Sequence, residues 1–151
     1  MIKKFTVLLI IIIFTTSCGF IPIYSSKNIN SIYIEKLNFT GDRTLNNYLK
    51  SNLNRYKKNE DTTKKISLEV VTDYQKITLS KDATGTVNKY ELVAQVIFTI
   101  VPSGQELVFK QRKIMENTNN KSDEKDFENS TKKTFANIIT NELILQLVTI
   151  Q

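Results

Sequence analysis

The 151-residue chain contains no histidine, no tryptophan and only one cysteine, Cys18. Histidine is the commonest general base and a frequent zinc ligand, so its absence excludes the common histidine-based catalytic and zinc sites. A lone cysteine cannot form an intramolecular disulfide, and an unpaired thiol in a secreted chain would be reactive. No nucleophile–base pair, ligand cluster or phosphate-binding loop is visible. We therefore expect no enzymatic activity, no cofactor and no metal.

The N-terminus explains why the single cysteine stands where it does. Lys3 and Lys4 precede an apolar stretch at 5–14, which is about half of the roughly 20 residues that a transmembrane helix needs. Small polar residues at 15–17 then lead into Cys18. A positive start, a short apolar core and small residues are typical of a secretory signal peptide. We predict a signal peptide at 1–17. Its end resembles the lipobox of bacterial lipoproteins, in which the cysteine is acylated and becomes the first mature residue.

One position departs from that pattern, because Thr15 stands where lipoproteins favour leucine or another aliphatic residue. Two alternatives therefore stay open: an ordinary signal peptide followed by an incidental cysteine, or an uncleaved anchor. Against them, acylation would block the otherwise reactive thiol of Cys18. Gly19 follows the cysteine, in place of the aspartate that retains many lipoproteins at the inner membrane. We expect a lipid anchor at Cys18 and a location on the periplasmic face of the outer membrane.

The remaining chain divides into a tether and one domain. Residues 18–30 contain Pro22 and several Ser and Asn residues, and are typical of a linker. Residues 31–151 are long enough for a single domain with one core. The formal charge of the whole chain is +6, and loss of the two lysines of the signal peptide leaves about +4. Without a dense basic block, nucleic acid is an improbable partner, whereas an anionic lipid or glycolipid head group fits the mild positive charge.

A strand and a helix are predicted at the start of this domain. In the stretch 31–39, Ile32 and Ile34 share one face and the apolar phase then slips to Leu37 and Phe39. The stretch 41–56 carries apolar residues at helical spacing, and Asp42 is placed to cap its first turn. These apolar residues are Leu45, Tyr48, Leu49, Leu53 and Tyr56.

Three further strands are predicted in the middle of the chain. The stretch 65–80 changes its apolar face, which predicts a bulge or bend near Gln75–Lys76, or a division into two strands. Asp82 and Gly85 indicate a hairpin loop at 81–89. The stretch 90–101 alternates strongly and is half apolar on its other face, as expected of an inner strand. A Pro-Ser-Gly turn leads to a last strand at 105–117, and such short connections imply antiparallel pairing.

A final helix of about 25 residues is predicted after the polar loop 117–127, with Ser122 or Asp123 as its cap. Its broad apolar stripe includes Phe127, Phe135, Ile138, Ile139, Leu143 and Leu147. The element order is therefore β-α-β-β-β-α. Since each helix has one apolar stripe, both should cover the same face of a sheet. The predicted fold class is α+β, a two-layer sandwich of about four strands, antiparallel or mixed, with two helices on one face.

Three segments resemble the lipopolysaccharide-assembly lipoprotein family LptE. They are CGFIPIY at the cysteine, GDRTLNNYL at the first helix and TGTVNKYELVAQVIFTIVPSGQELVF across the central hairpin. The resemblance covers Cys18 to about Leu147 in element order, and it depends on the combination because no one segment is specific. It implies a lipoprotein that plugs the β-barrel LptD, helps to assemble it and supports lipopolysaccharide insertion into the outer leaflet. Some members carry a C-terminal tail beyond the last helix.

Other functions also fit the size, the anchor and the fold class. One is an auxiliary lipoprotein of an ABC-type lipid transport system, which would differ in its partner. Another is a structural envelope lipoprotein. A lipid-anchored hydrolase would need a Ser or Asp constellation that the sequence does not show.

Basic residues near the loops are the candidates for contact with lipopolysaccharide phosphates. Ionised lysine and arginine bind phosphate through charge-assisted hydrogen bonds. Alternation along a strand predicts that Lys110 and Arg112 point the same way and Lys113 the other way. For any single one of these residues, the favoured interpretation is a solvated face that keeps the protein soluble. The candidates are Lys81, Lys110, Arg112 and Lys121.

Overall fold

The computed structural model describes residues 32–57, 65–118 and 120–150. Its strands are β1 (Tyr33–Gly41), β2 (Lys65–Lys81), β3 (Val87–Val101) and β4 (Gln105–Glu116). Its helices are α2 (Arg43–Leu53), the short 3-10 helix η2 (Asn54–Lys57) and α3 (Lys121–Thr149). The predicted order β-α-β-β-β-α is confirmed. The signal peptide, the tether and Cys18 lie outside the described residues.

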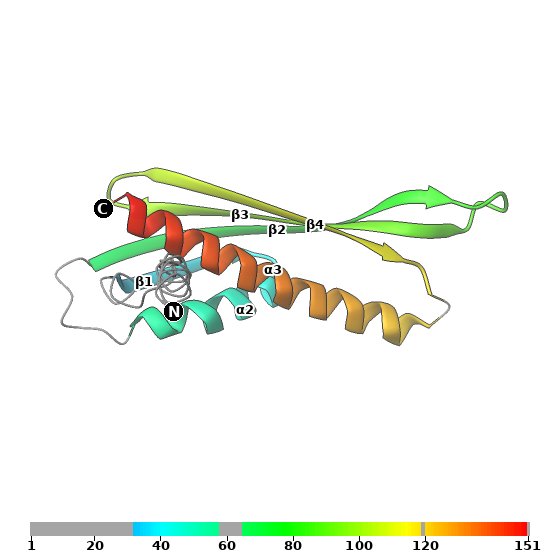
Figure 1. The fold of residues 1–151 in the computed structure, drawn as a ribbon, viewed down its shortest axis with the longest axis horizontal. Coiled ribbons are helices and arrows are strands. Elements are labelled where there is room, and N and C mark those ends of the chain that lie inside the picture. Colours follow the sequence, from blue (N-terminus) through cyan, green and yellow to red (C-terminus); the bar gives the residue numbers. More distant parts are fainter. Residues whose placement is uncertain (1–31, 58–64, 119, 151) are drawn as a thin grey trace, which may run out of the picture.

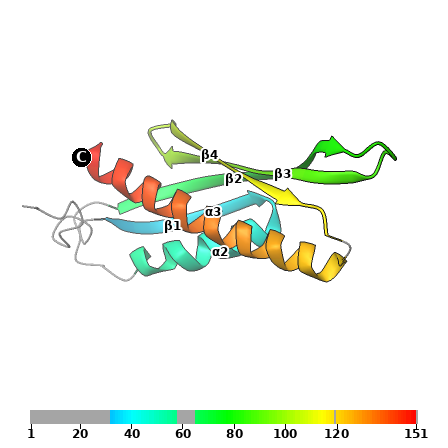
Figure 2. The same cartoon turned by 45° about the vertical axis from the view of Figure 1, so that its right-hand side comes forward.

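The four strands form one mixed sheet in the order β1-β2-β3-β4. β1 pairs with β2 in parallel, whereas β2 with β3 and β3 with β4 are antiparallel hairpin pairs. Both long helices lie on one face of the sheet (Figure 1). α2 contacts β1, and α3 contacts α2, β3 and β4 (Figure 2). The predicted two-layer α+β architecture is confirmed.

The phase slip in the first strand is a β-bulge. Ile34 pairs with Ile66 but Lys36 pairs with Ser67, so Glu35 is the extra residue. One inserted residue moves the following side chains to the opposite face. Leu37 and Phe39 therefore join Ile34 in packing against the core.

α2 forms as its sequence predicts. The Asp42 side chain caps the helix, because its Oδ1 accepts from the Leu45 amide at 2.7 Å. Leu45, Leu49 and Leu53 are fully buried beneath the sheet. The strand before this helix ends at Gly41, whose φ is +97°. A side-chain carbon at Gly41 would lie 1.8 Å from the Thr72 carbonyl oxygen, so only glycine lets β1 approach β2 there.

The core is one apolar cluster between the helices and the sheet. Near the centre of this cluster the Phe98 and Phe109 rings pack edge to face, with 5.8 Å between the ring centroids. The cluster includes the leucines of α2, the inward residues of all four strands and the C-terminal half of α3. The buried residues of α3 in this half are Phe135, Ala136, Ile139, Leu143, Ile144 and Leu147.

Two local predictions are wrong. β2 runs straight through Gln75–Lys76, and its register shifts lie between Thr78 and Lys81, next to the hairpin turn. The strand needs no bend because Ile77 and Leu79 simply point to the face that the helices leave open, where both are exposed.

The cap of the last helix was also misplaced. Asn120, not Ser122 or Asp123, caps α3 by accepting from the Ser122 amide at 3.0 Å. The earlier start puts Asp123 and Glu124 in the first turn, where the helix dipole favours negative charge.

The predicted stripe of α3 is broader than the face that the helix buries. Phe127 and Ile138 remain more than one-third exposed. Neither described helix contains an apolar stretch long enough to cross a membrane.

Candidate functional surfaces: the open sheet face and the projecting hairpin

The sheet face turned away from α2 and α3, called here the open face, carries an apolar row across three strands. Val71 pairs with Ile97, and Ile97 pairs with Val108, so the three side chains stand side by side. Val71 and Val108 are 47% and 57% exposed. Within the described ranges no helix covers this face (Figure 2). Exposed apolar surface arranged in this way is typical of a protein–protein contact.

Charged residues lie beside this row on the open face. Lys110 pairs with Gln95 and Arg112 with Val93 in the register of β3 and β4, which confirms that the two cations point the same way. Arg112 is 3.6 Å from the Glu91 carboxylate. Lys113 lies on the opposite face, over the Phe127 ring at 4.9 Å, also as expected.

The β2–β3 hairpin projects past the first turn of α3 (Figure 1). Asp82 organises its turn, since Oδ1 accepts from the Thr84 hydroxyl and from the Thr84 and Thr86 amides. The Thr84 hydrogen bond, followed by that of the Thr86 amide, lowers the pKa of the Asp82 carboxyl from its ordinary 3.8. Gly85 supplies the positive φ of the turn. Lys81 is exposed at the base of this ordered turn.

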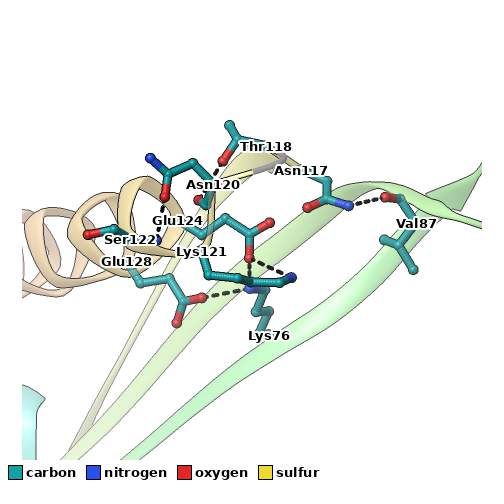
Figure 3. A network of polar contacts seen from close by, with 9 residues as sticks. All are labelled: Lys76, Val87, Asn117, Thr118, Asn120, Lys121, Ser122, Glu124 and Glu128. Carbon is teal, nitrogen blue, oxygen red and sulfur yellow. Dashed lines mark hydrogen bonds and ion pairs between the residues drawn. The ribbon is translucent and has the colours of Figure 1, made fainter.

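A charged cluster joins the hairpin to α3 (Figure 3). The Lys76 ammonium lies 3.2 Å from Glu124 Oε2 and 2.7 Å from Glu128 Oε1. It also stands over the Tyr90 ring at 4.2 Å. Lys121 reaches the same oxygen of Glu124 at 3.6 Å. We call Lys76, Tyr90, Lys121, Glu124 and Glu128 the hairpin cluster.

Glu124 is the buried member of this cluster, with 5% of its side chain exposed. Burial, the largest influence, raises the pKa of the Glu124 carboxyl, but Lys76 and Lys121 outweigh it and hold that pKa below its ordinary 4.5. Desolvation lowers the pKa of Lys76, but the hydrogen bonds to Glu128 and Glu124 outweigh it and hold that pKa above its ordinary value. Each charge of the pair thus stabilises the ionised form of the other.

A second ion pair joins α3 to the start of α2. Lys132 Nζ lies 2.8 Å from Asp42 Oδ2 and 3.9 Å from the centroid of the Tyr74 ring. Burial raises the pKa of the Asp42 carboxyl, but the Lys132 and Leu45 hydrogen bonds hold it below its ordinary 3.8. Desolvation, helped by the charges of Glu128 and Asp42, strongly raises the pKa of Tyr74. This region of α3 is therefore held by charge and aromatic contacts.

Solved structures of bacterial lipoproteins share this architecture. Rare lipoprotein B from Shewanella oneidensis superposes with a TM-score of 0.55 at 19% identity, covering 76% of this chain and 98% of that one. Its fold is similar to that of this chain. A lipoprotein B from Nitrosomonas europaea gives 0.54 at 16% identity, covering 81% and 87%. A minor lipoprotein from Acinetobacter baumannii gives 0.50 at 15% identity, covering 74% and 93%. The sequence matches no protein-family model and no curated protein.

On this lipoprotein B-like fold the four candidate cations do not form one site. Lys110 and Arg112 lie on the open face, and Lys81 stands at the projecting turn. Lys121 belongs to the hairpin cluster at the start of α3. Lys76, a further cation of the hairpin strands, binds Glu124 and Glu128 through its ammonium.

The partners of Lys76 could not be found by periodicity because they lie far away in the sequence. The one available signal was Glu124, a carboxylate at a helix position that faces the sheet, because such a position indicates an internal contact. Among the described residues no three His, Cys, Asp or Glu side chains are grouped as metal ligands would be.

Proposed function

We propose that this protein is an outer-membrane lipoprotein, acylated at Cys18, that plugs an LptD-like β-barrel and supports its assembly and the export of lipopolysaccharide. Two indications support the proposal. Three segments of the sequence, in combination with the element order, resemble the LptE family, and the fold resembles that of bacterial lipoproteins. In this role the protein acts by binding and not by catalysis.

The observation that carries the proposal is the open face. A lipoprotein that works alone in an aqueous compartment would gain by covering the row formed by Val71, Ile97 and Val108. A second protein that surrounds or flanks the domain would bury this row instead. In the part of the chain that the structure describes, both helices lie on the other side of the sheet and leave this face uncovered (Figure 1).

Affinity purification from detergent-solubilised membranes tests the partner. A tagged wild-type chain should retain a large β-barrel protein. Val108→Asp should release it, because the substitution places a charge in the apolar row without disturbing a buried residue. Ile138→Asp is the matched control, since Ile138 is a 38% exposed residue on the helix layer.

The other outcomes distinguish the alternative functions. Recovery of an ATPase complex would support the auxiliary transport function, and recovery of neither partner would support a structural envelope protein. Loss of the barrel in both aspartate variants would show that the open face is not the specific surface.

We further propose that Lys110 and Lys81 contact the phosphates of lipopolysaccharide. Arg112 and Lys121 already have carboxylate partners at 3.6 Å, so we expect smaller contributions from them. The double reversal Lys81→Glu/Lys110→Glu should weaken binding of the domain to lipopolysaccharide in moderate salt, with an unchanged circular dichroism spectrum. Lys65→Glu/Lys89→Glu is a control with the same charge change. Equal losses in both would indicate attraction by net charge alone.

A further inference from the structure

The end of the molecule opposite the projecting hairpin contains a pocket of about 300 Å³. It lies where β3 turns into β4 and where α3 ends (Figure 1). Val101 and Ile150 are 41% and 45% exposed there, although both are large apolar side chains. Its lining is mainly apolar: Ile66, Ile100, Val101, Pro102, Leu147 and Ile150.

The described chain enters the domain at this same end. Ile32 is buried in the core with 1% exposed, and Tyr33 pairs with Lys65, which itself lines the pocket. β1 and β2 are adjacent strands, so the entry point lies about one strand spacing, roughly 5 Å, from β2. Whatever precedes Ile32 therefore starts beside the pocket.

The sequence before Ile32 contains an apolar block that suits it. Five consecutive residues, Phe20–Tyr24, are apolar or aromatic, and the stretch 25–31 that follows is polar apart from Ile29. An apolar block in an aqueous compartment gains by burial. The roughly eight residues from Tyr24 to Ile32 span up to about 26–29 Å when extended, so the block reaches the pocket with chain to spare.

We propose that the Phe20–Tyr24 segment docks into this pocket and covers Val101 and Ile150. Docking requires only this chain and is independent of any barrel partner. It shortens the tether sharply. A free linker from Cys18 to Ile32 extends to nearly 50 Å, whereas Cys18 is only two residues, about 7 Å, from a docked Phe20. A lipid on Cys18 would then hold this end of the domain at the membrane and direct the β2–β3 turn away from it.

Photo-crosslinking of the purified chain tests the docking. Benzoylphenylalanine at Phe20 should crosslink to residues 101–105 and 147–150, as read by mass spectrometry, whereas the same probe at Lys27 in the polar stretch should not. The double substitution Val101→Glu/Ile150→Glu should reduce the yield several-fold. Leu79→Glu/Ile114→Glu is the matched control, because both are exposed apolar residues near the projecting hairpin at the other end of the sheet, and it should leave the yield unchanged. Mixing isotopically light and heavy chains separates crosslinks within one molecule from those between two copies.

The acyl chain itself is the competing occupant. The Cys18→Ser chain, secreted through a non-lipoprotein signal peptide, should show the same crosslinks as the lipidated protein. If a photoactivatable fatty acid on Cys18 labels the pocket and Phe20 does not, the pocket binds the lipid and the proposal is wrong. Crosslinks that scatter over the domain, join two copies or persist in the double-glutamate variant would also overturn it. Loss of barrel binding with the crosslinks intact would count against the proposed function alone.

Discussion

The two halves of the sheet differ in how much charge contributes to their contacts with the helices. In the proximal half, where β1 is present, β2 residues 65–72 and their partners pack on leucines of α2 and on Phe135 and Ile139 of α3. In the distal half, from Asp73 to the hairpin turn, β2 pairs with β3 only. Leu92, Ala94 and Met115 are buried in the common core there, and charged contacts with α3 are added to them: Lys76 of β2 binds Glu124 and Glu128, and Lys132 of α3 lies over the Tyr74 ring.

This difference predicts different responses to the solvent. Apolar burial is insensitive to pH and to the orientation of a single group, because it scales with area. Charged contacts depend on the protonation of each partner and are screened by salt when partly exposed. We therefore expect the distal half to open first, as a unit of lower local stability.

Phe98→Ala should have the largest effect and should act on the whole domain. Phe98 is fully buried at the centre of the proximal core and contacts the Phe109 ring. Its truncation should lower the free energy of unfolding by about 3–5 kcal/mol in a denaturant titration. Val108→Ala, at an exposed site, should change it by less than about 0.5 kcal/mol. Equal effects would show that the core does not lie between the layers.

Acid should destabilise the distal half more than the proximal half. The pKa of the Glu124 carboxyl, which binds Lys76 of the distal half, lies below its ordinary 4.5 in the folded protein. A depressed carboxyl pKa contributes stability that is complete above the unfolded pKa and is lost as the pH falls through the folded pKa. Hydrogen exchange measured from pH 5 to pH 3 should therefore show the amides of 74–92 losing protection while those of 66–70 keep it.

The pH experiment has an internal control. The variant Glu124→Gln should show a flatter dependence of the hairpin amides over the same range, because its side chain does not titrate. A parallel loss of protection in the two halves of the wild-type protein would contradict the division.

Lys76→Met should loosen the distal half alone. Methionine keeps the aliphatic stem over Tyr90 but removes the ammonium from Glu124 and Glu128. Hydrogen bonds between charged groups contribute enough that exchange of the hairpin amides should become about tenfold faster. Lys89→Met is the control, since Lys89 is half exposed and 3.8 Å from Glu116. An equal acceleration in α2 would show that the hairpin cluster supports the whole fold.

Thr131→Val should have the smallest effect. Thr131 is 1% exposed, and its hydroxyl has no hydrogen-bond partner among the described residues. Replacing an unpaired buried hydroxyl by a methyl group of the same shape should be neutral or stabilising in a thermal melt. A clear drop in the melting temperature would mean that this hydroxyl has a partner and that the distal half contains more polar bonding than its charges.

The proximal half could be predicted from the sequence and the contacts of the distal half could not. Leu45, Leu49 and Leu53 show a helical period, and the slip after Ile34 marks the bulge, because apolar periodicity records burial directly. Periodicity cannot reveal the contact between Lys76 and Glu124, because a charged residue that is buried against a partner has the same spacing in the sequence as an exposed one. The prediction of the α3 cap was wrong for a related reason. Several polar residues at 117–123 are suitable caps, and only the packing of the helix selects Asn120.

The parallel pairing of β1 with β2 determines the order in which the elements assemble. β2, β3 and β4 join through short turns, so their contacts close small loops at little entropic cost. Pairing of β1 with β2 brings together strands that are separated in the sequence by α2 and η2, so it closes a longer loop and is slower. The three-stranded meander therefore forms first, and β1 with α2 docks onto it last. During synthesis β1 and α2 are made before β2, the strand with which β1 pairs. The apolar stripe of α2 is therefore exposed until β2 has been made. Leu45, Leu49 and Leu53, which the complete fold buries, are the side chains that stay accessible to solvent during that interval.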